Sequence, residues 1–246
     1  MKLHVGTSGY GYKEWKGGFY PEKISPKEML RFYGERLNAV EINYTFYHMP
    51  TERVLAPWVE QVPDDFLFAL KAPQVMTHVK RLKEVGEEAE YFFTTLAILG
   101  KKLGTVLFQF PAYFHANLAR LEAFLPLIPA GLQCAFEFRS PTWLEAGVGE
   151  LLHLRGHTLC IADTDEHHAD EVIGATPWGY LRLRRTDYGE EDLSRWLQRV
   201  RAMEWERAFV FFKHEEEGAG AAAGPARALR FRELAVAEKA RKRQTG

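Results

Sequence analysis

Short runs of β-branched and aromatic residues recur eight times along this chain of 246 residues, each separated from the next by a turn or by a segment with helical spacing. Strands that alternate with helices form parallel sheets, because each helix returns the chain to the same end of the sheet. The predicted strands cover residues 3–7, 39–43, 66–71, 105–110, 133–139, 158–163, 179–184 and 208–213. The predicted helices lie near residues 26–37, 51–61, 84–101, 117–127, 142–154, 190–203 and 226–240.

The repeat continues without a linker, which predicts one domain over residues 1–246. Eight β–α units fit a closed TIM-type (β/α)8 barrel best. An open doubly wound sheet is the alternative, but residues 6–11 lack both the G-x-G-x-x-G spacing and the P-loop lysine of its phosphate loops. Residues 164–176 show little helical periodicity, so the sixth helix is predicted to be degenerate or replaced by a loop. Residues 215–225 are of low complexity and are predicted to be mobile.

Composition and charge exclude several classes of protein. No stretch approaches the roughly 18 apolar residues that a membrane-spanning helix needs. The N-terminus lacks the apolar core and the cleavage site of a signal peptide, so we expect a cytoplasmic protein. The formal net charge is −1, which argues against broad affinity for nucleic acid or anionic lipid. Any anion site must therefore be local.

Charged and polar side chains end nearly every predicted strand, although a strand that is buried on both faces should be apolar throughout. Many of them recur at alternate positions, where side chains share one face of the strand. In a barrel these strand ends meet at the C-terminal mouth, which is where barrel enzymes place their active sites. The residues expected around this mouth are Glu41, Asn43, Lys71, Gln109, Glu137, Arg139, Asp163, Arg182, Arg184 and Lys213.

The charges at these strand ends are unequal, because cations outnumber carboxylates. An anionic ligand, most simply one that carries phosphate or a carboxylate, would balance the excess. The alternative is a lattice of internal salt bridges that closes the mouth without a ligand, since unpaired buried charges are costly. The cations are Lys71, Arg139, Arg182, Arg184 and Lys213, with His78 as a further candidate, and the carboxylates are Glu41, Glu137 and Asp163.

Aromatic residues gather in the loops that should overhang the mouth. Tyr10 and Trp15 follow the first predicted strand, Tyr47 follows the second, and Trp143 follows the fifth. Two interpretations are open at this point. The rings form either a small packed cap or a surface on which the base or sugar ring of a ligand stacks. In the second case these four residues bind substrate.

General acid–base catalysis by a carboxylate is the chemistry that these residues allow. The catalytic candidates are Glu137, Glu41 and Asp163. Glu137 is preferred over Glu41 because Arg139 lies two residues further along the same strand face, where it can hold an anion beside the carboxylate. No G-x-S-x-G elbow is present, and neither cysteine sits beside a plausible base. The chain also lacks organic-cofactor and metal-ligand motifs, so we assign no cofactor and expect no transition metal.

A series of short motifs follows the predicted strands in order over almost the whole chain. They are Gly6-Thr-Ser-Gly-Tyr with Trp15 and Phe19-Tyr-Pro21, Val40-Glu-Ile-Asn43 with Phe46-Tyr47 and Pro50, Lys71-Ala-Pro73 with Thr77-His78, Leu107-Phe-Gln-Phe-Pro111, Phe136-Glu-Phe-Arg139 with Trp143, Asp163, and Tyr180-Leu-Arg182. Together they resemble the YecE-like family, a domain of unknown function. The resemblance implies a barrel fold and brings no established activity.

Two positions depart from the pattern of that family. The family continues strand seven into a His-Gly pair, where this chain has Arg184-Arg185. It ends strand eight in paired asparagines, where this chain has Lys213-His214. Both changes add positive charge, which favours an anionic ligand in this protein.

Three functions are open on these grounds. The first is an enzyme, of the hydrolase, lyase or isomerase type, that acts on a phosphorylated or otherwise anionic small molecule. The second is a nucleic-acid-binding protein or repair-type phosphodiesterase, in which the arginines hold the backbone and the aromatic residues stack on an unpaired base. The third is a ligand-binding protein without chemistry. A positive stripe beyond the mouth would favour nucleic acid, whereas a closed pocket would favour a small molecule.

Overall fold

The computed structural model describes residues 1–169, 176–213 and 223–244, with side chains as far as residue 238. Of the predicted mobile segment 215–225, only residues 223–225 lie in the described part, and they are helical. His214 and residues 170–175 of the predicted weak connection lie outside it.

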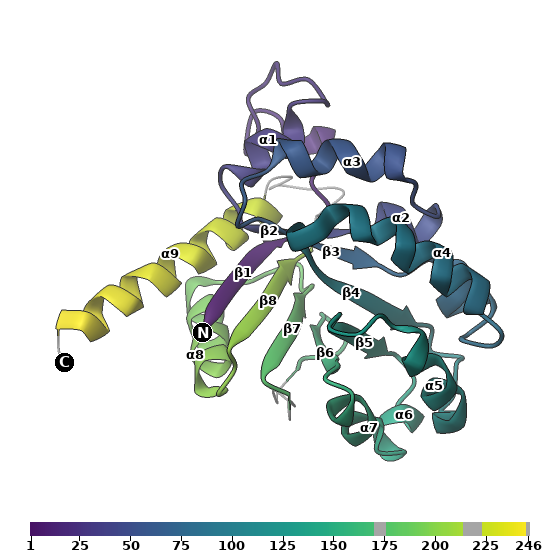
Figure 1. Cartoon of the computed structure of the whole chain (residues 1–246). Helices are drawn as coiled ribbons and strands as arrows, with labels where there is room; N and C mark the ends of the chain where they lie inside the picture. The colour runs from purple at the N-terminus through teal and green to yellow at the C-terminus, as the bar shows by residue number, and fades with distance from the viewer. Residues whose placement is uncertain (170–175, 214–222, 245–246) are drawn as a thin grey trace.

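Eight parallel strands form one sheet in the order β1-β8-β7-β6-β5-β4-β3-β2. The sheet curls until β1 and β2 lie side by side, and helices cover its outer face (Figure 1). The predicted TIM-type (β/α)8 barrel is therefore confirmed. The strands are β1 (Lys2–Thr7), β2 (Ala39–Ile42), β3 (Leu67–Lys71), β4 (Leu103–Phe110), β5 (Cys134–Phe138), β6 (Thr158–Asp163), β7 (Trp178–Leu183) and β8 (Arg207–Phe212).

Short helices connect most of the strands, and the long helix α9 runs along β1 and β8 at the end of the described chain (Figure 1). The predicted helix 142–154 is divided in two at Gly147, whose φ of 73° is left-handed and ends the first part. Between β6 and β7 the described residues 164–169 and 176–177 contain no helix. The helices are α1 (Met29–Gly34), α2 (Tyr44–Tyr47), α3 (Glu52–Gln61), α4 (Gly86–Leu96), α5 (Leu118–Phe124), α6 (Thr142–Glu145), α7 (Val148–Leu154), α8 (Glu190–Ala202) and α9 (Ala223–Gln244).

Side chains close the seam between β1 and β2, where the two strands share only one bridge, from Ser8 to Glu41. The Asn38 amide accepts a hydrogen bond from the N–H of Val5 at 2.8 Å and donates to the carbonyl of Leu3 at 2.9 Å. The strands approach closely at Gly6, where a Cβ would lie 1.8 Å from the carbonyl oxygen of Ala39. The barrel thus closes without a regular ladder at this point.

Apolar side chains fill the inside of the barrel below its mouth. Small residues from β2, β3 and β5 face large aromatic residues from β7 and β8, so the two halves of the interior complement each other in volume. The polar groups at the mouth consequently lie above a buried, largely apolar layer. This layer consists of Ala39, Ala69, Leu107, Ala135, Trp178, Tyr180, Phe209 and Phe211.

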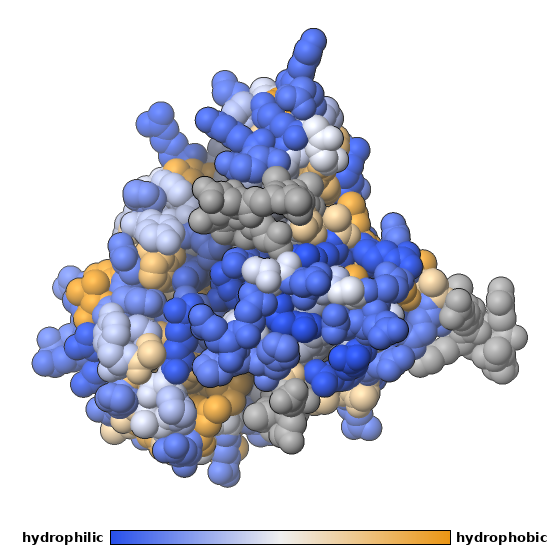
Figure 2. Space-filling model, turned by 180° about the vertical axis from the view of Figure 1, so that it is seen from behind, coloured by the Kyte–Doolittle hydropathy of each residue, from blue (hydrophilic) through white to orange (hydrophobic). Residues whose placement is uncertain are grey.

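The outer surface is polar over much of its area. Figure 2 shows the molecule from behind, where the described residues are mostly hydrophilic and the apolar ones form small, separate patches. Among the residues that the structure describes, no helix combines the length and apolar character needed to cross a bilayer.

Candidate functional site

Two buried glutamates share one arginine at the C-terminal mouth of the barrel. Arg182, on β7, donates from Nη2 to Glu41 Oε1 at 2.9 Å and from Nη1 to Glu137 Oε2 at 2.6 Å. Glu41 comes from β2 and Glu137 from β5, so the guanidinium connects strands on opposite sides of the interior. None of the three residues is more than 6% exposed. We refer to Glu41, Arg182 and Glu137 as the mouth triad.

Neutral side chains complete the hydrogen bonds of the two glutamates. Ser8 Oγ and Tyr180 Oη each donate to Glu41 at 2.7 Å. Gln109 Nε2 donates to Glu137 at 2.7 Å. Burial opposes ionisation of both carboxyls, but the charge and hydrogen bonds of the shared arginine outweigh it, lowering the pKa of Glu137 to about 2 and that of Glu41 below its usual range. Both glutamates are therefore ionised at neutral pH.

Lys71 and Arg184 lie within electrostatic reach of the mouth triad without being paired. Lys71 ends β3, and its Nζ lies 3.9 Å from the centre of the Phe46 ring. Burial, followed by the positive charge of Arg182, lowers the pKa of Lys71 to about 8. The same two causes lower the pKa of Arg184. Within the described part of the chain, neither residue forms an ion pair, so their charges are not neutralised by a carboxylate.

Arg139 and His78 complete the cationic edge of the mouth. Arg139 Nε lies 3.5 Å from Glu137 Oε1, and the side chain of Arg139 is 54% exposed. His78 is half-buried, and its ring meets that of Phe46 edge-on at 4.9 Å. Burial, followed by the positive charges of Lys71 and Arg139, lowers the pKa of His78. The imidazole thus lies close enough to these cations to be repelled by them when it is protonated.

Four other predicted site residues lie beyond the strand ends without touching the mouth triad. Asn43 and Lys213 directly follow β2 and β8 and are half-buried. Tyr10 is half-buried in the loop after β1, whereas Tyr47, on α2, is 65% exposed. None of the four has a side-chain hydrogen bond or ion pair to the mouth triad within the described residues.

Asp163 lies outside the mouth, contrary to the expectation from the sequence. Its carboxylate accepts hydrogen bonds from Arg185 Nε at 2.9 Å and from Tyr188 Oη at 2.8 Å, and the indole of Trp196 on α8 lies beside it. The reason is the alternation of β6. Cys160 Sγ lies 3.9 Å from Glu137 and so faces the interior, and a residue three positions later must face the helices. Asp163 is therefore removed from the mouth and from the catalytic candidates.

Trp15 and Trp143 are also unavailable to a ligand, because both are completely buried. Trp15 packs against the rings of Tyr12 and Tyr20 at 4.8 and 5.9 Å. Trp143 stacks on Phe138 at 4.3 Å and donates from Nε1 to a backbone carbonyl. For these two residues the packed-cap interpretation is correct, and their assignment to substrate binding is withdrawn.

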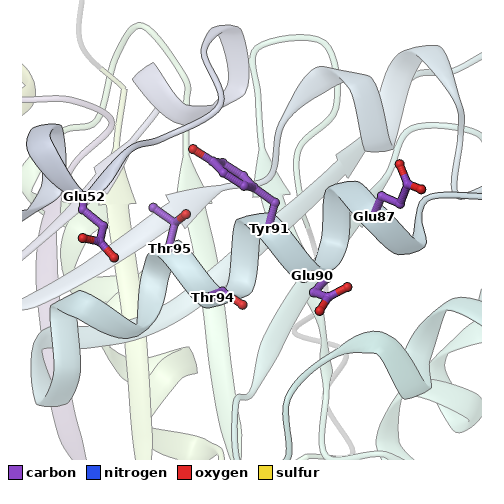
Figure 3. A pocket seen from close by; sticks show the side chains of 6 residues that line it. All are labelled: Glu52, Glu87, Glu90, Tyr91, Thr94 and Thr95. Carbon is purple, nitrogen blue, oxygen red and sulfur yellow. The ribbon is translucent and has the colours of Figure 1, made fainter.

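Two larger cavities among the described residues are lined by loops and helices around the barrel. One, of about 610 Å³, lies at the ends of β1 and β2 and is considered below. The other, of about 490 Å³, is a groove lined by residues of α3 and α4 (Figure 3). Three glutamates line the second cavity, so it repels anions. Its lining residues are Glu52, Glu87, Glu90, Tyr91, Thr94 and Thr95.

Metal ligands do not cluster in the described part of the chain, where no three His, Cys, Asp or Glu side chains lie together as a metal site requires.

The comparison with known families agrees with this architecture. The sequence pattern of the family described as "Protein of unknown function DUF72" matches residues 4–245. The chain belongs to the DUF72 family. Its relatives include UPF0759 protein YecE of Escherichia coli K12, which is 32% identical over 146 residues, and UPF0759 protein YunF of Bacillus subtilis, which is 29% identical over 150 residues.

Both matches cover 57% of this chain, and they cover 54% of YecE and 52% of YunF, so the chain spans about half the length of these relatives. A solved DUF72 structure from Thermotoga maritima is 27% identical and superimposes with a TM-score of 0.82, covering 95% of this chain and 99% of that one. A DUF72 structure from Enterococcus faecalis, 18% identical with a TM-score of 0.78, covers 94% of both chains and shows the same fold.

Some residues of the mouth are absent from the sequence-based site. Ser8 and Tyr180 bind Glu41, and neither is charged, so a search for charged strand ends passes over them. Tyr180 has a usable signal, because it lies two positions before Arg182 on the same strand and so shares its face. Ser8 has no such signal, since it follows the last residue of β1.

Proposed function

We propose that the barrel mouth binds a small molecule that carries a phosphate or carboxylate group. One observation carries this proposal. Four cationic side chains lie at the mouth with only two carboxylates, and Arg182 already bonds to both carboxylates. Arg139 adds a weaker contact to Glu137 at 3.5 Å, so the cations without a carboxylate partner among the described residues are Lys71 and Arg184.

A buried cation without a partner is costly. The lowered pKa of Lys71, about 8, is in keeping with such a cost, because burial and the nearby charge of Arg182 both disfavour protonation of this amine. A bound anion would relieve the repulsion among Lys71, Arg139 and Arg184. Arginine adds geometric selectivity, since its guanidinium can bind phosphate or carboxylate through two parallel hydrogen bonds.

Proton transfer on such a ligand would suit Lys71 best. A pKa of about 8 keeps both its protonated and its neutral form accessible near neutral pH. Glu137 and Glu41 remain candidates for the same role, although both already accept hydrogen bonds from Arg182. An enzyme of the hydrolase, lyase or isomerase type would suit this arrangement, and we expect it to be cytoplasmic.

The test is thermal unfolding of the protein in millimolar phosphate or sulfate. At about 100 times its dissociation constant an anion stabilises the folded state by about 2.7 kcal/mol, which raises the melting temperature by several degrees. Lys71→Met should remove most of this rise, whereas Lys101→Met, at an exposed position, should keep it. Wild-type protein that gains no stability from either anion would disprove the proposal.

The salt dependence of the binding affinity distinguishes a nucleic-acid ligand from a small molecule. Binding of a backbone with many phosphates weakens steeply as salt rises, because each contact releases counterions. For a ligand with one phosphate, the logarithm of the binding constant should fall with the logarithm of the salt concentration only as steeply as a single phosphate contact requires. A short single-stranded oligonucleotide that binds more tightly than phosphate, with a steep slope, would favour the nucleic-acid function.

A further inference from the structure

A cavity of about 610 Å³ opens between the loop after β1, the end of β2 and helix α3. This size lies within the range of small-molecule sites. Its walls are largely apolar and aromatic, and they come from parts of the chain that are distant in sequence. The lining residues that matter here are Tyr10, Ile42, Asn43, Val54 and Trp58.

Two half-buried polar side chains of this cavity make no hydrogen bond among the described residues. They are the Asn43 amide and the Tyr10 hydroxyl. An amide offers both a donor and an acceptor, which matches the edge of a nitrogen heterocycle. The aromatic rings of Tyr10 and Trp58 give the apolar surface on which such a ring packs.

The cavity and the mouth triad lie on the two sides of the same strand end. Ile42 lines the cavity, whereas its neighbour Glu41 points into the barrel. The N–H of Gly9, which also lines the cavity, donates to the carbonyl of Glu41 at 2.7 Å. Asn43 directly follows β2 and also lines the cavity. A molecule that passes over this strand end would reach both the cavity and the mouth.

We propose that the cavity binds a planar nitrogen heterocycle of nucleobase size, so that the ligand is a mononucleotide-like molecule with its phosphate at the mouth cations. This inference rests on the proposed anion site for the phosphate. The heterocycle would pack against Tyr10 and Trp58 and hydrogen-bond to Asn43.

The experiment compares the affinities of three kinds of probe by calorimetry. The probes are inorganic phosphate, the nucleosides adenosine and cytidine, and their 5′-monophosphates. At least one monophosphate should bind more than tenfold more tightly than phosphate. Asn43→Leu, which preserves size but removes the amide, should weaken that monophosphate about tenfold and leave phosphate unchanged. Val54→Trp, which narrows the cavity from α3, should have the same selective effect.

Lys71→Met separates this inference from the proposed function. It should weaken phosphate and the monophosphates while leaving the nucleosides unaffected. Monophosphates that bind no more tightly than phosphate overturn the heterocycle site but keep the anion site. An Asn43→Leu protein with unchanged monophosphate affinity overturns the site as well. Tighter binding of a short single-stranded oligonucleotide than of every monophosphate would overturn the assignment to a free mononucleotide.

Discussion

Two clusters of arginine and carboxylate groups lie at the C-terminal end of the barrel, a buried one inside it and a partly buried one outside. In the inner cluster, Arg182 bridges Glu41 and Glu137. In the outer cluster, Arg185 bridges Asp163, at 2.9 Å, and Asp192 of α8, at 3.3 Å. Each cluster thus contains one arginine shared by two carboxylates.

The surroundings of the two clusters differ. Asp163 is enclosed by the hydroxyl of Tyr188 and the indole of Trp196, so the outer cluster connects β6 to α8. The inner cluster is bordered instead by Lys71 and Arg184, which have no carboxylate partner among the described residues. Unequal charge, rather than charge at a strand end, therefore distinguishes a candidate ligand site from a structural contact.

The largest expected effect comes from removing the shared arginine of the inner cluster. Arg182→Met removes the buried cation that two buried carboxylates share and leaves Glu137 only the longer contact to Arg139, so we expect it to lower the free energy of unfolding by about 3 to 5 kcal/mol. Arg184→Met is the matched control, two residues further along, where no ion pair is lost and stability should be unchanged or slightly raised. Chemical denaturation measures both. Equal losses in the two variants would contradict the assignment of Arg184 as an unpaired cation.

Neutralising one carboxylate in each cluster should give a smaller effect that separates their functions. Glu137→Gln and Asp163→Asn should each cost about 2 to 3 kcal/mol of stability, because each weakens a buried charged hydrogen bond. Glu137→Gln also makes the mouth more positive, so sulfate should bind about fivefold more tightly, whereas Asp163→Asn should leave sulfate affinity unchanged. Calorimetric titration of both variants tests this. An equal change in sulfate affinity would place both carboxylates at one site.

Glu137→Gln should also change how the free energy of unfolding depends on pH in acid. In the wild type the pKa of Glu137 is about 2, below its ordinary value of 4.5, so its stabilising contribution is complete above pH 4.5 and is lost as the pH falls towards 2. Glu137→Gln should reduce this dependence. If Glu137 transfers a proton in a reaction, the same variant should keep substrate binding and lose turnover, and turnover at the wild-type rate would refute that role.

The last expected effect concerns the pH dependence of anion binding. Lys71 has a pKa of about 8, so its ammonium form predominates at pH 7 and becomes a minor species at pH 9. Sulfate keeps its charge over this range, and its affinity should fall about tenfold between these two values. Lys71→Met should bind sulfate weakly and with little dependence on pH. A wild-type affinity that does not change between pH 7 and pH 9 would exclude Lys71 from the site.

The expectation that charged residues at strand ends lie at the mouth is met by some residues and not by others, for physical reasons. Alternation places Glu137 and Gln109 side by side at the mouth, as β4 and β5 pair in register at these two residues. The place of Asp163 at the end of a strand predicts a mouth residue, but its separation of three positions from the inward-facing Cys160 puts it on the opposite face of β6. Counting alternate positions along β6 from a residue known to face inward would place Asp163 on the helix-facing side. The burial of Trp15 and Trp143 could not be read in the same way, because loops have no fixed period.

The order of β–α repeats and the excess of cations at their ends were determined by the sequence alone, since both depend on local periodicity and residue type. The tertiary structure decided which charges cancel. Arg182 meets Glu41 across 141 positions of sequence, and only the closure of the barrel brings them within 2.9 Å. The same closure leaves Lys71 and Arg184 without carboxylates among the described residues. Pairing of buried charges depends on distances through space, which no local pattern contains.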